Sequence, residues 1–217
     1  MGMLTFLAAN GLGMSESFFT ATNATPGTGI ETINDTPTTV TATTPQTIIY
    51  NQANATSGEN QWVIPMYYRL SGTAVNTSGT NFRIAQYLDN IDRYTSGGTA
   101  ITGKSTSYDT RTGYTDRTPK ARVNHGVLVA TAAGSQKLIA NTYLSDDVFV
   151  VDETVELVYG DQIGGGVKDT SSSMMVAPVW IGRKCSLLYH WLTTGTDSAD
   201  LAAEIEICWA ELKHTRF

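Results

Sequence analysis

The chain has 217 residues, a formal net charge of −6 and a charged fraction of only 16%. An acidic chain lacks the basic face with which nucleic-acid-binding proteins displace counterions from phosphates, so we expect no nucleic-acid partner. Its 41% hydrophobic content is enough for one buried core, and 33 threonines fill much of the place that charged residues usually take. Threonine is β-branched and tolerates water, which favours sheet over helix.

The first 46 residues are expected to form an extended N-terminal arm. Residues 20–46 (TATNATPGTGIETINDTPTTVTATTPQ) carry too little apolar surface to build a core of their own. Residues 1–14 lack the basic start of a signal peptide. We therefore expect two parts: an arm over residues 1–46, ordered by pairing with a neighbouring subunit, and a β-sandwich domain over residues 47–217.

Short apolar runs then alternate with polar, glycine-containing turns. The expected strands are residues 48–50, 61–70, 81–88, 98–106, 122–132, 136–143, 148–151 and 154–159. Many short strands without a clear helix indicate an all-β protein, and a jelly-roll-like antiparallel β-sandwich accounts for the number best. An immunoglobulin-like sandwich is the alternative, although about 100 residues usually suffice for one. Residues 102–120 and 160–173 are expected to be long flexible loops, which in a compact domain are usually either contact loops or disordered.

The most apolar stretch, residues 174–192 (MMVAPVWIGRKCSLLYHWL), is not a membrane span. Pro178 and the Gly182-Arg183-Lys184 triplet divide it into pieces far shorter than the roughly 20 residues that a helix needs to cross a bilayer. Two strands joined by a tight turn fit better, at residues 173–181 and 184–192.

The following segment, residues 199–212, is compatible with either a helix or a strand. Ile205, Ile207 and Trp209 alternate with polar residues as in a strand, and the spacing of Leu201, Ile205 and Leu212 also suits a helix. We favour a strand that forms an antiparallel hairpin with residues 184–192. In a symmetric register Cys185 would face Cys208, although both cysteines also suit buried free thiols.

One local stretch is both basic and aromatic. Residues 104–122 contain five cationic side chains together with Tyr108 and Tyr114, interrupted by Asp109 and Asp116. This pattern indicates a solvated loop or a protein contact rather than a nucleic-acid site. A second candidate, Arg93, either orders its own turn through Asp89 or forms an interface hot spot. The candidate interface residues are Arg93, Tyr94, Tyr108, Arg111, Tyr114 and Arg117.

No motif predicts catalysis. The triplet at residues 164–166 lacks the Lys-Ser/Thr pair of a phosphate loop. Asp146, Asp147 and Asp152 could hold Ca²⁺ but follow no known loop spacing. The three histidines are far apart and no nucleophile elbow is present. We therefore expect no catalytic residue, no cofactor and no bound metal.

Four runs carry a family resemblance: LDNIDRYTSGGT at residues 88–99, APVWIG at 177–182, SLLYHW at 186–191 and EIEICWAE at 204–211. Together they resemble virion structural proteins of tailed bacteriophages, in particular the small jelly-roll proteins that cover or cement the outer capsid. The resemblance covers about the C-terminal two-thirds of the chain. It implies a jelly-roll fold, a homo-oligomer with a trimer as the expected state, attachment to a major capsid protein, and no enzyme activity.

Three function classes remain to be weighed. The first is a capsid decoration or cement protein, made in the host cytoplasm and located on the virion surface, with no membrane partner. The alternative is a glycan- or receptor-binding module that stacks sugars on Trp62, Tyr67, Tyr94, Tyr108 or Tyr114, although burial in the core is the commoner fate of Trp62. A β-sandwich carbohydrate enzyme would need two carboxylates facing each other across a cleft.

Overall fold

A computed structural model describes residues 18–23, 25–31, 40–53, 61–74, 82–105, 118–130, 136–143, 154–160, 171–193 and 202–213. Every regular element within these ranges is a β-strand, so the all-β prediction is confirmed. The strand prediction for residues 199–212 is also confirmed, because residues Ala202–Lys213 form β13. Within the described ranges there is accordingly no helix long and apolar enough to cross a membrane.

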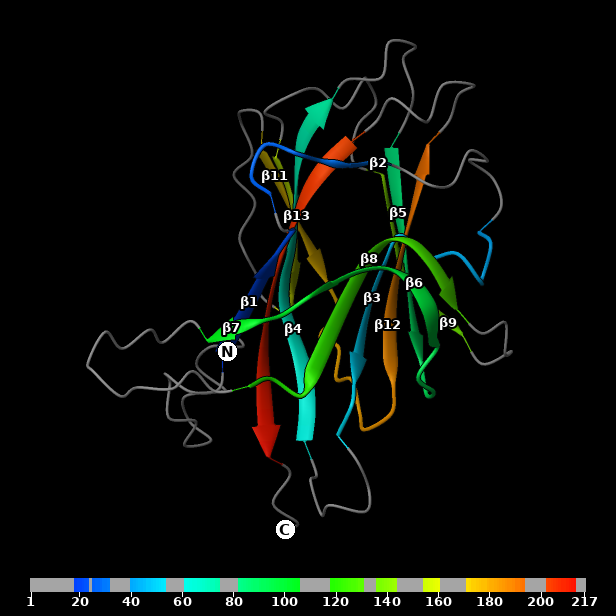
Figure 1. Cartoon of the computed structure of the whole chain (residues 1–217), viewed down its shortest axis with the longest axis vertical. Coiled ribbons are helices and arrows are strands. Elements are labelled where there is room, and N and C mark those ends of the chain that lie inside the picture. Colours follow the sequence, from blue (N-terminus) through cyan, green and yellow to red (C-terminus); the bar gives the residue numbers. More distant parts are fainter. Residues whose placement is uncertain are drawn as a thin grey trace, which may run out of the picture.

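The strands form two sheets that face each other as a sandwich (Figure 1). Sheet A has the order β11 (Ser171–Val176), β10 (Thr154–Tyr159), β4 (Gln61–Ala74), β13 (Ala202–Lys213), β1 (Phe18–Thr22) and β7 (Lys104–Ser105), and β2 (Ile30–Glu31) also pairs with β13. Sheet B has the order β6 (Tyr94–Ile101), β8 (Ala121–Ala130), β3 (Thr47–Asn51), β12 (Ser186–Thr193), β5 (Phe82–Asp89) and β9 (Lys137–Tyr143).

Eight of these strands pair as a jelly roll. Taken in chain order as β1, β3, β4, β5, β9, β10, β12 and β13, the first pairs with the eighth, the second with the seventh, the third with the sixth and the fourth with the fifth. All four pairs are antiparallel, and they alternate between the two sheets. This is one long hairpin rolled up into a sandwich, so the predicted jelly roll is confirmed.

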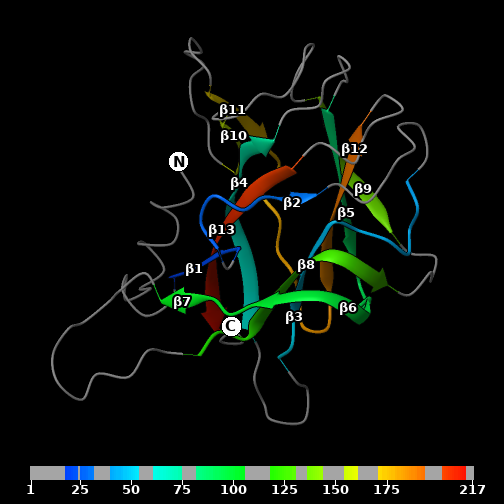
Figure 2. The same cartoon turned by 45° about the horizontal axis from the view of Figure 1, so that its top comes forward.

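The remaining strands are additions to that roll. The parallel partner of β10 is β11, at one edge of sheet A. Strands β6, β7 and β8 are inserted between β5 and β9. In the turned view, β6 and β7 form a nearly continuous ribbon that passes from sheet B to sheet A, where β7 pairs with β1 (Figure 2).

The core lies between the sheets and follows from alternation along the strands. In β10 every second residue is buried, and β13 directs Ile205, Ile207 and Trp209 into the same apolar cluster. Several polar atoms within this core are hydrogen bonded: for example, the indole N–H of Trp191 donates to the Tyr68 hydroxyl at 2.9 Å. Such pairing removes the cost of burying a donor or acceptor alone.

The central strands of sheet B, β3 and β12, are buried on the outer face as well as on the inner face, whereas the edge strand β6 is mostly exposed. Ile48, Tyr50 and Leu188 point away from the main core, yet they form a second buried cluster. Residues 40–46 cross this face: the Thr43 carbonyl accepts from the Ala130 N–H at 2.8 Å, and the Gln46 N–H donates to the Tyr189 carbonyl at 2.8 Å. Tyr87 and Tyr94 also pack against this cluster, and all five residues of β3 are buried.

The structure corrects the predicted arm only over the residues that it describes. Residues 18–22 are the first core strand of the chain's own sheet A, β2 pairs with the same sheet, and residues 40–46 cover sheet B. These parts of the segment 1–46 therefore pack within their own subunit, and the sandwich begins well before residue 47. The prediction was wrong here because composition shows that a segment cannot fold alone but not which surface supports it.

The predicted hairpin of residues 184–192 with residues 199–212 is also wrong. β12 belongs to sheet B and β13 to sheet A, so the chain crosses between sheets at this point. Cys185 and Cys208 are both free thiols. The strand expected at residues 173–181 ends at Val176, and Ile181 then makes a single bridge to Val63. The strand expected at residues 148–151 lies outside the described residues.

His190 makes the covered face of sheet B sensitive to acid. It has no exposed surface, packs edge-on against Tyr87, and lies beside the backbone of Thr44. Burial lowers the pKa of His190 to about 4, against 6.5 for a free side chain. Because the unfolded chain binds the proton more readily, His190 stabilises the fold fully above pH 6.5, and this contribution is lost between pH 6.5 and about 4.

We expect His190→Asn to remove up to about 3 kcal/mol of the pH dependence of unfolding across that window. Urea unfolding of both proteins at several pH values between 4 and 7.5 measures it, with His125→Asn as the matched control. His125 is buried too and burial lowers its pKa, but less. An unchanged slope in His190→Asn would contradict the assignment.

Candidate functional site

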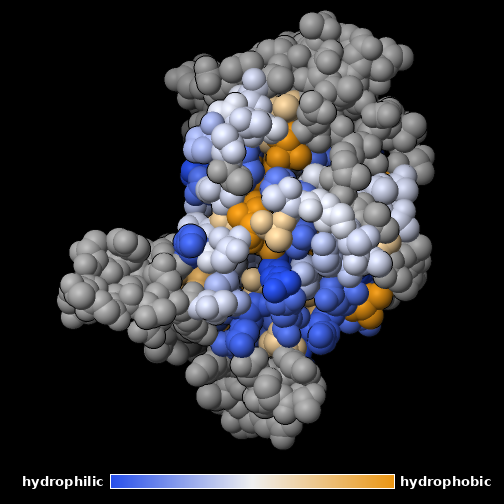
Figure 3. Space-filling model, in the orientation of Figure 1, coloured by the Kyte–Doolittle hydropathy of each residue, from blue (hydrophilic) through white to orange (hydrophobic). Residues whose placement is uncertain are grey.

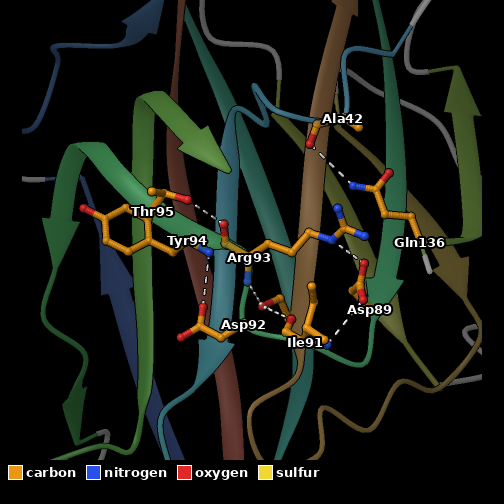
Figure 4. A network of polar contacts seen from close by, with 9 residues as sticks. Ala42, Asp89, Ile91, Asp92, Arg93, Tyr94, Thr95 and Gln136 are labelled. Atoms are coloured by element: carbon orange, nitrogen blue, oxygen red, sulfur yellow. Dashed lines mark hydrogen bonds and ion pairs between the residues drawn. The ribbon is translucent and has the colours of Figure 1, made fainter. Parts of the chain in front are cut away.

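The turn between β5 and β6 is built around a buried ion pair. The guanidinium Nε of Arg93 donates to a carboxylate oxygen of Asp89, and both side chains have no exposed surface. The Arg93 N–H donates to the Ser186 hydroxyl at 3.2 Å, and that hydroxyl donates to the Ile91 carbonyl at 2.9 Å. Figure 4 shows the Arg93 side chain stretched across sheet B, with its guanidinium between Asp89 and the contact of Gln136 with Ala42.

Arg93 therefore orders its own turn, which was one of the two interpretations of its sequence. Since its side chain is fully enclosed by its own chain, it offers no surface to a partner, and we remove it from the candidate interface residues. Tyr94 is half-buried, stacks on Tyr50 with ring centroids 5.5 Å apart, and donates its hydroxyl to the Gly97 carbonyl at 3.0 Å. Tyr108, Arg111, Tyr114 and Arg117 lie outside the described residues.

The two ends of the segment 106–117 are both held against β13 of sheet A. One carboxylate oxygen of Glu211 accepts the N–H groups of Lys120 at 2.7 Å and Ala121 at 2.9 Å, and the indole N–H of Trp209 at 3.3 Å. At the other end, Gly103 crosses Trp209 so closely that an added Cβ would lie 2.3 Å from the indole ring. A side chain at position 103 would therefore push this part of the chain away from Trp209.

Glu211 is almost fully buried, so the anchor is sheltered from water. Hydrogen bonds to a charged acceptor are stronger than neutral ones, roughly twice as strong. The segment between residues 105 and 118 thus leaves from and returns to a rigid platform, which is the usual way in which proteins present a binding loop.

A second candidate site is a pocket of about 270 Å³ beside Trp180, at the end of the sandwich where β5 leaves sheet B. Trp180 is one of the two large apolar side chains with the most exposure among the described residues, at 37%. The pocket walls are Leu88, Asp89, Asn90, Lys137, Trp180 and Cys185. An aromatic platform with an amide and an ammonium group beside it could hold a ring with hydroxyl or acidic groups.

The strap that carries Trp180, residues 177–185, is held in place by Asn51. The Asn51 side-chain amide donates to the carbonyls of Gln61 at 2.8 Å and Ile181 at 3.1 Å, and its backbone bonds to Lys184 and Cys185. Asn51 is fully buried, so this one residue joins β3, β4 and the strap. Trp180 consequently has a fixed position.

A second hollow, of about 170 Å³, lies on the outer face of sheet A and offers less to a ligand. Of its carboxylates, Glu204 accepts the Gly27 N–H, and Glu206 accepts both the Tyr67 hydroxyl and Arg69 at 3.1 Å. These groups already stabilise the sheet. The face drawn in Figure 3 is mixed in character, with strongly hydrophilic residues gathered in its lower half and only small apolar areas.

Neither metal chemistry nor thiol chemistry is favoured by the described side chains. No group of three or more His, Cys, Asp or Glu residues among them could hold a metal ion. Burial raises the pKa of the Cys208 thiol to about 12, and it raises that of Cys185 as well. The aspartates proposed for Ca²⁺, at residues 146, 147 and 152, lie outside the described part of the chain.

Comparisons with known proteins give no family. No family model matches the chain, no curated protein matches it, and no solved structure matches it. The interpretation of the sites therefore rests on their geometry.

Sequence reasoning missed Glu211, Asn51 and Trp180. Asn51 ends a strand in a Gly/Asn-rich region where turns are common. Trp180 was assigned to a strand, although it lies between Pro178 and Gly182, both of which disfavour regular pairing. The alternation of Ile205, Ile207 and Trp209 places Glu211 on the same inner face, which was a usable signal for its burial.

We expect the Arg93–Asp89 pair to behave as one unit. Arg93→Met leaves a buried carboxylate without its cation and should cost about 3–5 kcal/mol in the free energy of unfolding. The double variant with Asp89→Asn should cost clearly less than the two single changes added together. Urea denaturation measures all three, and Lys137→Met at an exposed position is the control. Additive single effects would show that the pair is not coupled.

Proposed function

We propose that this chain is a structural protein of a virion, one that binds the outer surface of a phage capsid and stabilises it through contacts between subunits. The observation that carries the proposal is the fixed base of segment 106–117. Glu211 and Trp209 hold both of its ends on sheet A, and the segment itself contains Tyr108, Arg111, Tyr114 and Arg117. Tyrosine and arginine are the residue types that most often dominate protein interfaces.

Two other features support the same proposal. The jelly roll is the fold that the family resemblance implies. The central strands β3 and β12 of sheet B are buried on both faces, which gives a stiff body for a loop to act from. The partners of such a protein are the major capsid protein and further copies of itself, with a trimer as the expected state.

Purified protein added to capsids assembled without it should raise their melting temperature by several degrees, because each bound copy would tie neighbouring capsid subunits together. Replacing residues 106–117 by a Gly/Ser linker of equal length should weaken capsid binding at least tenfold. The control is Leu138→Ser, an exposed side chain on β9, in the other sheet. Differential scanning calorimetry and sedimentation binding measure both effects. Capsids whose melting is unaffected by saturating protein would exclude the proposal.

A glycan- or receptor-binding module is the second candidate, and the pocket beside Trp180 favours it. Of the platforms expected from the sequence, Tyr67 donates to Glu206 and Tyr94 stacks on Tyr50, whereas Trp180 remains substantially exposed. Trp62 is half-buried and meets Trp180 edge-on at 6.0 Å.

If this second function is the right one, a glycan array should give hits with the wild-type protein that Trp180→Ala weakens at least tenfold, since stacking on an aromatic ring supplies much of the affinity. Tyr94→Phe is the matched control, because it keeps the ring that packs on Tyr50 and removes only a hydroxyl. An array without hits, or hits that survive Trp180→Ala, would remove Trp180 as a sugar platform.

A further inference from the structure

The outer face of sheet A is divided into a charged half and an apolar half. Cross-strand register places Thr22, Glu206 and Arg69 in one row, where Arg69 also pairs with Glu156 at 3.6 Å. At the other end, Phe18, Ala210 and Ile64 form a row. We call the apolar half the outer patch; it consists of Phe18, Trp62, Ile64, Met66, Ala210 and Leu212.

The outer patch is more buried than its position predicts. A sandwich buries the inner face of each sheet, and side chains on the outer face of an uncovered sheet meet solvent. Ile64 and Ala210 nevertheless have no exposed surface, and Leu212 is only 9% exposed. The apolar side chains that form the patch all belong to β1, β4 and β13, that is, to the sheet itself. Trp180 of the strap meets Trp62 at one edge of the patch. The burial of Ile64 and Ala210 requires a further segment over this half of the sheet.

Residues 1–17 are placed to supply that segment. The chain enters the sandwich at Phe18, which is itself part of the outer patch and lies at the apolar end of β1 rather than at its charged end. The preceding residues, MGMLTFLAANGLGMSES, contain a single charge, Glu16. They supply large apolar side chains in number, namely Met1, Met3, Leu4, Phe6, Leu7, Leu12 and Met14.

We propose that residues 1–17 cover the outer patch of their own chain. Because the segment is attached to the chain at Phe18, within the patch, it can fold back onto the patch with almost no loop to close. The entropic cost is therefore lower than for binding a second copy of the protein. An uncovered apolar face of this kind is a common cause of association or aggregation. The covering segment therefore limits the interaction surfaces of the free protein to its loops and rim.

Deleting residues 1–17 tests the proposal. We expect the truncated protein to keep the strand-rich circular dichroism spectrum and cooperative unfolding of the full chain, and to bind the apolar dye ANS several-fold more strongly. A synthetic peptide of residues 1–17 should bind the truncated protein in a 1:1 ratio and reverse the gain in dye binding. Light scattering at low concentration should give the same number of subunits before and after truncation.

A full-length variant provides a second test in case the truncated protein does not fold. Leu4→Ser, Phe6→Ser and Leu7→Ser together keep the chain length and should raise dye binding as the deletion does. Thr5→Ala, Asn10→Ala and Ser15→Ala form the matched control and should leave it unchanged. Unchanged dye binding in both the truncated and the triple-serine protein would overturn the proposal. A drop in subunit number on truncation would overturn it too, because residues 1–17 would then cover a neighbouring copy.

Discussion

The pairing of β13 with strands on both of its sides is the constraint on which the rest of the structure depends. Its twelve residues pair with β4 along their whole length, and residues 206–210 also pair with β1. Ile205, Ile207 and Trp209 point from it into the main core. The last strand of the chain thus closes the roll that the first strand began. β13 buries apolar side chains on one face, and its backbone is hydrogen bonded to strands on both sides. Together these two features fix its position in the sheet.

Covering the second face of sheet B places unusual demands on its polar residues. Arg93, Asp89 and His190 are all removed from water there, and each is costly to bury. A buried ion pair often adds little net stability compared with apolar residues of the same size. Its value in this protein is geometric, because Arg93 and Ser186 together fix the turn from which β6 begins. The direction of the β6–β7 ribbon, and hence its crossing to sheet A, depends on that turn.

Function is expected at the ends of the roll rather than in its interior. The core is filled with aromatic and aliphatic side chains whose polar atoms bond to each other, as Tyr159 and Tyr189 do at 2.7 Å. Two surface features are held by single buried residues that join separate elements: Glu211 fixes the base of segment 106–117, and Asn51 fixes the strap of Trp180. Both arrangements place a contact element on a rigid body and lower the entropy lost on binding. The structural role and the glycan-binding role therefore differ in which of these elements is used.

The sequence by itself determined the fold class, the location of most strands and the exclusion of a membrane helix at residues 174–192. These follow from local alternation, from β-branched composition and from the position of Pro178, all of which act over a few residues. Tertiary structure alone decided which strands pair. The expected partner of β12 was its neighbour β13, but rolling up the long hairpin placed the two in different sheets. Tertiary structure also decided that residues 18–22 pair with a strand of their own chain, and that Asn51, Glu211 and Arg93 are buried. The physical reason is that alternation shows which side chains avoid water, whereas the surface that shelters them comes from distant parts of the chain.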